Sequence, residues 1–312
     1  MNENYHVIII GGGPAGLTAG LYCARSRIDA VLVEKGIIGG QMTNAERVEN
    51  YPGIPEGTSG IRLGQMIHEQ ATSYGLETLS AEVISVVPAR RHNLVCTSEG
   101  DITSDSMIIA SGAQYRRLGV PGEEEFAGKG VSYCATCDGP LFKDKPLAVV
   151  GGGDSAVTEA LYLSKFASSV KVVHRRSQLR ASRIFQERAM AEPKIDFVWE
   201  SVVARIEGDG SVRRLILKST KDDKISVLEV AGVLVAAGSV PNSGQWRGVL
   251  ALDEDGYIVT NELMETSIPG IFAAGDVRHN SARQVITAAG DGATAAMSAV
   301  RFLSFESKRG TL

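Results

Sequence analysis

Long apolar runs and an excess of positive charge are both absent from this chain of 312 residues. No stretch approaches the ~18 consecutive apolar residues that a membrane-spanning helix needs, so we expect no membrane association. The net charge of −4 gives no basic field for binding nucleic acid phosphates. Met1–Asn4 lead directly into an apolar strand, and we therefore expect no secretory signal and a cytoplasmic location.

Cysteine is scarce too, with four residues, Cys23, Cys96, Cys134 and Cys137. Only the last two are close in sequence, which excludes the disulfide framework of a small secreted domain. Neither a second C-x-x-C nor a paired H-x-x-x-H accompanies them, so we predict no zinc site. Redox chemistry is the remaining interpretation of the pair. We expect Cys23 and Cys96 to be inert core thiols.

Glycine is abundant, at 35 residues, and part of the excess lies in the loop Gly11-Gly-Gly-Pro-Ala-Gly16. This loop predicts a βαβ unit whose glycines let the backbone approach a pyrophosphate at a helix N-terminus. Pro14 suits the first helical position, where no N–H is needed. Glu34 follows Gly16 by 18 residues, close to the ~20 expected of a carboxylate that binds ribose hydroxyls. The predicted strand, helix and second strand are residues 6–10, 15–25 and 30–33.

A second loop, Gly151-Gly-Gly-Asp-Ser-Ala156, repeats this pattern, but its second strand ends in His174-Arg-Arg176, with Arg180 about one turn later. Guanidinium groups bind a 2′-phosphate through paired, charge-assisted hydrogen bonds. We therefore interpret the second site as one for NADPH, whereas Glu34 suits FAD or NAD in the first. A solvated basic cluster at the start of a helix is the alternative interpretation of the arginines. In this second βαβ unit, the first strand, the helix and the second strand are predicted at residues 147–150, 155–166 and 170–173.

The predicted fold class is α/β, with two Rossmann-like doubly wound dinucleotide-binding domains, the second inserted in the first. Hydrophobic residues make up 44% of the chain and charged residues 22%, which is typical of globular domains with a sizeable core. Each half later reaches an apolar strand ending in glycine, at Gly112 and Gly238, and then a polar or proline-containing link that marks a domain junction. No nucleotide loop follows the second link, so the C-terminal segment is expected to complete the first domain. The predicted links are residues 113–121 and 239–244, the last strand and helix are 270–276 and 282–302, and the domains are 1–113 with 245–312, and 114–244.

The pair Cys134-Ala-Thr-Cys137 lies between the two glycine-rich loops. Its spacing lets the sulfurs form a disulfide and lets one thiol resolve a mixed disulfide made by the other. Asp138 follows directly, and its carboxyl group is suited to exchange a proton with a departing thiolate. A role for Asp138 as a turn or cap residue before Gly139-Pro140 is equally open. Two dinucleotide loops with a dithiol between them indicate electron flow from nicotinamide to flavin to disulfide.

In the order and spacing of its motifs, essentially the whole chain resembles the low-molecular-weight bacterial thioredoxin reductases. The single motifs occur in other flavoprotein disulfide reductases, whereas C-x-x-C-D inside the pyridine nucleotide domain is more specific. The resemblance implies FAD in residues 1–113 with 245–312, NADPH in 114–244, a homodimer, and thioredoxin as the protein substrate. The residues that carry it are Gly11–Gly16, Cys134–Gly139, Gly151–Ala156, His174–Arg176, Arg180, Ala273–Asp276, Arg283 and Gln284.

The resemblance also implies site residues. Gly275 and Asp276 would meet the ribityl and phosphate part of the flavin, with Arg283 and Gln284 beside its ring. Gln41 and Asn50 would lie there too, although each is equally suited to hold a loop. The expected catalytic residues are Cys134, Cys137 and Asp138. The expected FAD residues are Gly11, Gly13, Pro14, Ala15, Gly16, Glu34, Lys35, Gln41, Asn50, Gly112, Gly275, Asp276, Arg283, Gln284 and Val285. The expected NADPH residues are Gly151, Gly153, Asp154, Ser155, Ala156, His174, Arg175, Arg176, Arg180 and Gly238.

By the same resemblance, NADPH reduces the flavin, the flavin opens the Cys134–Cys137 disulfide, and the dithiol reduces thioredoxin. We expect Cys137 to be the sulfur nearer the flavin, and which cysteine attacks the partner stays open. The two links would act as hinges that let the dithiol and the nicotinamide reach the flavin in turn. Ser239 stands where some relatives have histidine, which leaves the local nicotinamide contacts open.

Three other functions fit parts of the pattern. The first is the same chemistry with another acceptor; because Met1 precedes the first strand by only a few residues, we do not expect the extended alkyl hydroperoxide reductase form. The second is a ferredoxin- or flavodoxin-linked NADP reductase, which would use the two domains without the cysteines. The third is a flavin-binding redox sensor that does not turn over, for which the sequence shows no effector module.

Overall fold

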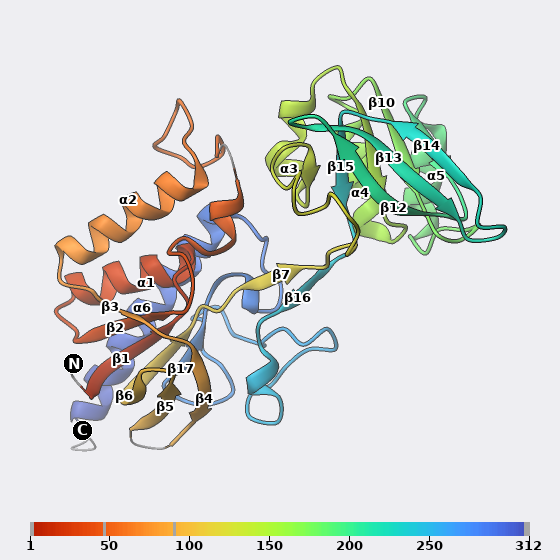
Figure 1. The fold of residues 1–312 in the computed structure, drawn as a ribbon. Helices are drawn as coiled ribbons and strands as arrows, with labels where there is room; N and C mark the ends of the chain where they lie inside the picture. The colour runs from red at the N-terminus through yellow and green to blue at the C-terminus, as the bar shows by residue number, and fades with distance from the viewer. Residues whose placement is uncertain (1–2, 46–47, 90–91, 309–312) are drawn as a thin grey trace. The chain divides into compact units, whose positions relative to one another are not determined.

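The computed structural model describes residues 3–45, 48–89 and 92–308 and divides into two compact units (Figure 1). Unit 1 comprises Met1–Gln114 with Val240–Leu312, and unit 2 comprises Tyr115–Ser239. The predicted class, α/β with two Rossmann-like domains, is confirmed. None of the helices in the described part of the chain has the length and apolarity to span a bilayer.

Unit 1 is built on a sheet with the strand order β3-β2-β1-β6-β5-β4, and β17 also pairs with β6. Strands β1, β2, β3, β6 and β17 run parallel, and β4 and β5 are antiparallel. The apolar runs of β1 and β6 are buried on both faces, as expected of central parallel strands. The bounds are β1 (Asn4–Ile10), β2 (Ala30–Glu34), β3 (Glu77–Ser80), β4 (Val83–Val87), β5 (Asn93–Thr97), β6 (Gly100–Ile109) and β17 (Ile271–Ala273).

Strand β6 joins the two segments of unit 1. Its first half pairs with β5, and its last residues, Met107–Ile109, pair with β17. The C-terminal segment thus contributes a strand to the same sheet as the N-terminal segment.

The helices of unit 1 include a closely packed pair, α1 and α6, which lie side by side in Figure 1. A Cβ atom added to Gly292 of α6 would lie 2.1 Å from the carbonyl oxygen of Ala15 in α1. Glycine therefore sets the separation of the two helices. The bounds are α1 (Pro14–Arg25), η1 (Gly40–Asn44), α2 (Gly60–Ser73), η3 (Gly244–Trp246), η4 (Gly275–Val277) and α6 (Val285–Lys308).

Unit 2 contains a parallel sheet with the order β11-β10-β9-β15-β8 and a separate antiparallel sheet, β12-β13-β14. Helix α4 packs on the parallel sheet, and its buried residues Val157, Ala160 and Leu163 join the core. The strands are β8 (Val131–Ser132), β9 (Pro146–Val150), β10 (Ser169–Val173), β11 (Ile195–Val198), β12 (Ser201–Gly208), β13 (Val212–Ser219), β14 (Ile225–Glu229) and β15 (Gly232–Val235). The helices are α3 (Ala135–Asp138), η2 (Gly139–Phe142), α4 (Asp154–Leu163) and α5 (Arg183–Ala191).

The chain passes between the units twice, and the two passages pair as the short strands β7 (Ala113–Tyr115) and β16 (Ser239–Pro241). On the unit 1 side, the N–H of Asn242 donates to the carbonyl of Gly112 at 2.9 Å. On the unit 2 side, the N–H of Arg116 donates to the carbonyl of Gly238, also at 2.9 Å. The two passages are therefore joined to each other by one backbone hydrogen bond at the unit 1 end and one at the unit 2 end.

The bounds of two predicted helices are wrong. The helix predicted at 282–302 is α6, which begins at Val285 and ends at Lys308. It begins later than predicted because Arg283 has a φ of 54° and cannot belong to a right-handed helix. The helix predicted at 155–166 is the ten-residue α4, which ends at Leu163. Ser164 follows as its C-cap, and its hydroxyl donates to the carbonyl of Leu161 at 2.9 Å.

Gly292→Ala is expected to lower the free energy of unfolding by about 1–3 kcal/mol, because the new methyl group meets backbone rather than a flexible side chain. Gly290→Ala in the same helix is the matched control, since its added Cβ would have no neighbour within 4 Å. That control should raise stability by about 0.5–1 kcal/mol through helix propensity. Urea unfolding measures both, and equal stability of the two variants would contradict the packing argument.

Candidate functional site

Cys134 and Cys137 form a disulfide directly after strand β8, with an S–S distance of 2.08 Å and a Cα–Cα distance of 5.3 Å. The Sγ of Cys134 caps the short helix α3 by accepting the N–H of Cys137 at 3.2 Å. Cys137 is exposed and Cys134 is half-buried. The pair is therefore held at a helix N-terminus, where a thiolate is electrostatically stabilised.

Asp138 is the last residue of α3, and its side chain is half-buried. Its Oδ2 accepts the hydroxyl of Ser132 at 2.5 Å. Burial raises the pKa of Asp138, and the hydrogen bond from Ser132 acts in the opposite direction. The side chain makes no capping bond to the following 3-10 helix, so the structure gives no support to the cap interpretation.

The other two cysteines belong to unit 1. Cys23 is fully buried in α1, and burial raises the pKa of its thiol to about 12, so it is inert at neutral pH. Cys96 lies in β5 and is half-buried rather than fully in the core. Among the described residues, no cluster of three or more metal-ligating side chains occurs.

The first glycine-rich loop lies at the carboxyl end of β1 and opens α1. Gly13 is the N-cap of α1, no side chain caps it, and an added Cβ would meet no atom within 4 Å. The carboxylate of Glu34 accepts the N–H of Gly12 at 2.6 Å and that of Gly36 at 2.7 Å. An open, uncapped helix N-terminus beside a carboxylate at the end of β2 fits a pyrophosphate and a ribose. Pro14, Ala15 and Gly16 follow in the first turn of α1.

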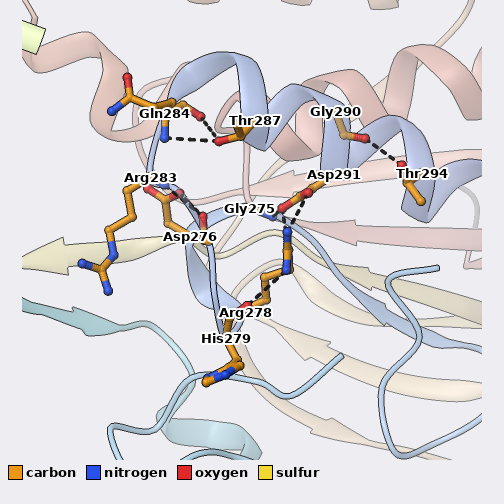
Figure 2. Close-up of polar contacts among 11 residues, drawn as sticks. Gly275, Asp276, Arg278, His279, Arg283, Gln284, Thr287, Gly290, Asp291 and Thr294 are labelled. Carbon is orange, nitrogen blue, oxygen red and sulfur yellow. Dashed lines mark hydrogen bonds and ion pairs between the residues drawn. The ribbon is translucent and has the colours of Figure 1, made fainter. Parts of the chain in front are cut away.

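Figure 2 shows the second part of the unit 1 site, where η4 meets the start of α6. Gly275 has a φ of 76°, and an added Cβ would lie 2.9 Å from the Cβ of Ala15, so glycine is required for this turn to approach α1. Asp276 is half-buried, and its partial burial raises the pKa of its carboxyl group. Its Oδ1 accepts the hydroxyl of Ser281 at 2.9 Å. The guanidinium of Arg283 donates to the hydroxyl of Tyr257 at 3.1 Å.

The remaining expected FAD residues differ in whether their contacts join distant segments of the chain or stay local. Asn50 donates to the Oε1 of Gln284 at 3.2 Å, which joins two residues 234 positions apart just before Val285 begins α6. In contrast, Gln41 accepts from its neighbour Asn44 at 3.0 Å, within η1. The contacts described for the rest are a surface ion pair of Lys35 with Glu82 at 3.0 Å and the bond from Asn242 to the carbonyl of Gly112.

An ion pair that the sequence analysis missed holds η4 against α6 (Figure 2). The carboxylate of Asp291 accepts from Arg278 at 2.6 and 3.0 Å and from the N–H of Gly275 at 3.1 Å. Asp291 is 8% exposed. The signal that predicts it is Asp291 itself, the one carboxylate among residues 285–300, which are rich in alanine and glycine and are expected to be buried.

The second glycine-rich loop has the same form in unit 2. Gly153 is the N-cap of α4 without a side-chain cap, and its added Cβ would meet nothing within 4 Å. Asp154 accepts the N–H of Ser182 at 2.6 Å and thereby ties the loop to the start of α5. Ser155 and Ala156 continue the first turn of α4. Gly151, at the end of β9, would carry a Cβ only 2.6 Å from that of Ala156.

His174 packs beneath this loop, because a Cβ at Gly152 would lie 2.3 Å from its ring. Its Nε2 is 3.1 Å from the carbonyl oxygen of Gln178, and burial lowers its pKa. The backbone N–H of Arg180 donates to the carbonyl of Gly152 at 2.7 Å. The histidine therefore supports the loop.

Arg175, Arg176 and Arg180 line one open pocket of about 440 Å³. Two residues of its wall were missed from the sequence, Glu200 and Thr220, which come from segments on either side of β12 and β13. The Thr220 hydroxyl donates to the carbonyls of Arg175 at 3.2 Å and Glu200 at 3.0 Å. Glu200 also pairs with Lys221 at 2.6 Å. The three arginines are thus gathered around a space that suits a phosphate group.

Two uncapped glycine-rich loops on parallel sheets, with a C-x-x-C disulfide on the second, define a dinucleotide-dependent disulfide oxidoreductase. The pattern of the family described as pyridine nucleotide-disulphide oxidoreductase matches residues 5–292. The chain is 46% identical over 300 residues to the thioredoxin reductase of Listeria innocua, covering 96% of this chain and 94% of that one.

Solved structures agree with this match. The thioredoxin reductase of Streptococcus pyogenes has 44% identity and a TM-score of 0.94, with 98% of this chain and 100% of that one covered. The Lactococcus lactis thioredoxin reductase, solved in the FR conformation, has 42% identity and a TM-score of 0.66, with coverages of 96% and 99%. The chain belongs to the pyridine nucleotide-disulphide oxidoreductases and, among them, to the low-molecular-weight thioredoxin reductases. The predicted resemblance and oxidoreductase class are confirmed.

Asp291→Asn is expected to lower the free energy of unfolding by about 3 kcal/mol, because it leaves the guanidinium of Arg278 buried without a counter-charge. Glu69→Gln is the matched control, since its pair with Arg62 is exposed and should matter by less than about 1 kcal/mol. Urea unfolding of both variants measures the difference. A loss in Asp291→Asn no larger than in the control would show that the ion pair does not hold η4.

Proposed function

We propose that the protein reduces the disulfide of thioredoxin with electrons from NADPH, through FAD bound in unit 1 and the Cys134–Cys137 pair in unit 2. The observation that carries this proposal is the position of the disulfide. It follows strand β8 at the same sheet edge as the second glycine-rich loop, with Asp138 beside it. The cytoplasmic location and the homodimer implied by the resemblance stay predictions.

FAD fits the described residues of unit 1. The uncapped N-terminus of α1 and the open space at Gly13 suit the pyrophosphate, and Glu34 at the end of β2 suits the ribose. Gly275 lies against Ala15 at the start of α1, and Asp276 follows it in η4. When bound, FAD would supply the step that couples hydride transfer from NADPH to two-electron reduction of the disulfide.

NADPH fits unit 2 in a corresponding way. Gly153 leaves the N-terminus of α4 open for the pyrophosphate, and Arg175, Arg176 and Arg180 offer guanidinium groups to the 2′-phosphate. Thr220 holds the backbone of Arg175 in place. His174 supports the loop from below rather than lining the arginine pocket.

The protein's own groups manage the sulfur chemistry. Two-electron reduction opens the Cys134–Cys137 bond and leaves two sulfur atoms that need protons or a helix N-terminus for stabilisation. The helix α3 supplies the N–H of Cys137 to the Sγ of Cys134. Asp138 supplies and recovers a proton as the dithiol forms and then reduces the partner disulfide.

The dithiol and the nicotinamide belong to one unit and the flavin to the other, so each must reach the flavin in turn. The paired links β7 and β16 are the proposed hinges. The two solved relatives differ in TM-score, 0.94 and 0.66, at nearly equal identity. This difference supports rotation, because a changed placement of two rigid units lowers such a score while leaving each unit intact.

We expect the purified protein to oxidise NADPH anaerobically with oxidised thioredoxin as the sole acceptor. Changing Cys134 and Cys137 together to Ser should abolish thioredoxin reduction while NADPH still bleaches the flavin, because the disulfide follows the flavin in the electron path. Cys96→Ser is the control and should retain activity. Retained catalytic turnover of NADPH in the double variant would show that electrons leave the flavin without the cysteines, as in a ferredoxin- or flavodoxin-linked reductase. In the unaltered protein, flavin bleaching without reoxidation by thioredoxin would favour another acceptor or a sensor.

Arg175→Ala combined with Arg176→Ala should raise the KM for NADPH at least ~10-fold and leave the KM for NADH within about twofold. The reason is that hydrogen bonds between charged groups are worth about 1.5–3 kcal/mol, and ~1.4 kcal/mol is a factor of ten. The matched control removes the exposed pair Arg213 and Arg214 of β13, which has the same charge change. If the two KM values rise equally, the phosphate assignment is wrong.

A further inference from the structure

The hydroxyl of Ser132 lies at the centre of the redox loop. Ser132 is the last residue of β8 and is 4% exposed. Its Oγ accepts the N–H of Cys134 at 3.2 Å and lies 2.5 Å from the Oδ2 of Asp138 and 3.4 Å from the carbonyl oxygen of Cys134. One O–H makes one strong donation, and the shorter contact directs it to the carboxylate. Ser132 therefore connects the backbone of one cysteine to the carboxyl group of Asp138.

The surroundings of Asp138 are otherwise apolar. Besides Ser132, Ala135 and Gly139, the cavity beside its carboxyl group is lined by Phe142 from η2, Leu147 from β9, Leu163 from α4, and Val233 and Leu234 from β15. Its volume is about 10 Å³, which is room for no more than one water molecule. None of the elements packed against Asp138 within the described part of unit 2 directs a charged side chain into this cavity.

The titratable groups of the loop that carries Asp138 are Cys134 and Cys137, once reduced, and Tyr133, whose hydroxyl donates instead to Glu123 at 2.9 Å. Helix α4, which packs against α3, adds Glu159, one turn before Leu163. Ser132 is thus the polar side chain whose hydrogen bond lowers the pKa of Asp138, against the effect of burial, which raises it. A hydroxyl is suited to this because it donates to the carboxylate and can rotate to accept from the protonated acid.

We propose that Ser132 is a positioning residue for proton transfer at the dithiol, where its hydroxyl orients the carboxyl group of Asp138 and adjusts its proton affinity. The inference rests on the proposed redox role of Cys134 and Cys137. Ser132 itself does not touch the disulfide bond and acts through Asp138.

The proton and electron balance of the step is as follows. One thiol of the reduced pair gives its proton to the Asp138 carboxylate, and the thiolate attacks a disulfide, forming a mixed disulfide and releasing one thiolate. The second thiol of the pair then displaces the other half, so the Cys134–Cys137 bond reforms and two electrons have passed to the acceptor. With an aliphatic acceptor each released thiolate takes up one proton, the first from the Asp138 carboxyl group and the second from the resolving thiol. With an aromatic acceptor, whose thiolate stays ionised, the same two protons pass to the solvent. Ser132 donates to Asp138 whenever it is ionised.

The test follows the exchange step without NADPH or thioredoxin. The protein is reduced with dithiothreitol, desalted, and mixed in a stopped-flow instrument with a small aromatic disulfide whose released thiolate is coloured. Single-turnover rate constants are recorded across pH for the parent, Ser132→Ala, Ser132→Thr and Asp138→Asn. Rate constants of this kind do not depend on the fraction of folded protein, so a lower yield of one variant does not obscure the result.

Ser132→Ala should slow exchange roughly tenfold near neutral pH, part of the 10²–10⁴ that general acid–base catalysis typically contributes. It should also move the limb that reports Asp138 to higher pH, because the ionised carboxylate loses its donor. Ser132→Thr, which keeps the hydroxyl, should restore the parent profile. In the Asp138→Asn background, Ser132→Ala should have no further effect on the pH dependence.

Ser164→Ala is the matched control, since Ser164 is also a buried serine of unit 2 and its hydroxyl donates to the carbonyl of Leu161. It should leave the pH profile unchanged. The proposal is overturned if Ser132→Ala keeps the parent profile, or if its effect persists unchanged in Asp138→Asn, since Ser132 would then only hold the loop. Because neither NADPH nor thioredoxin is present, failure of the proposed substrate assignment leaves this result intact.

Discussion

Strand β15 pairs in parallel with β9 on one side and with β8 on the other, so that their carboxyl ends meet at one edge of the unit 2 sheet. The register aligns Ser132, Leu234 and Val149 in one row across the three strands. Two residues beyond that row along the chain, Cys134 follows β8 and Gly151 follows β9. This alignment depends on backbone hydrogen bonds alone, and it places the disulfide and the dinucleotide loop at the same edge before any side chain acts. The chemistry proposed for unit 2 depends on this register.

Much of this arrangement is predictable from sequence, because it rests on local patterns. The glycine-rich loops, Glu34 at the end of its strand and the C-x-x-C pair each occupy one short segment, and the run of apolar residues before each glycine-rich loop and before Glu34 is enough to place these strands. The return of the C-terminal segment also follows, since no new nucleotide loop begins there. In contrast, the pair of Arg278 with Asp291 and the wall of the arginine pocket at Thr220 depend on packing between distant segments. Such contacts have no pattern of their own in a single sequence. The start of α6 was misplaced for a related reason, since the left-handed backbone of Arg283 is set by its bonds to Ser281 and Tyr257.

In unit 1 the site residues also lie at the carboxyl ends of parallel strands, and there the buried carboxylate of Asp291 stabilises their arrangement. The ends of β1, β2 and β17 bring Gly12, Glu34 and Gly275 together, but η4 is too short to hold its own conformation. Asp291 orders it by accepting three bonds, two from Arg278 and one from the N–H of Gly275. The carboxylate projects from α6, whose distance from α1 is set by the contact of Gly292 with Ala15. The packing of α1 against α6, the ion pair and the position of Asp276 are therefore connected. A change in any one of them is expected to alter the geometry of the proposed flavin site.

The two half-buried carboxyl groups, Asp138 and Asp276, show how similar contacts lead to different roles. Burial raises the pKa of both, and each accepts a hydroxyl from a serine. Asp276 also lies in the electric field of Arg283, Asp291 and Arg278. Several neighbouring charges therefore act on its pKa, and no single contact determines it. Asp138 has apolar neighbours in its cavity and a single neutral donor. Its protonation therefore responds to a small change nearby, such as the appearance of a thiolate on Cys134 or Cys137. A group that must give and take a proton in each cycle is better served by the second environment than by the first, because strong fixed charges would hold it in one state.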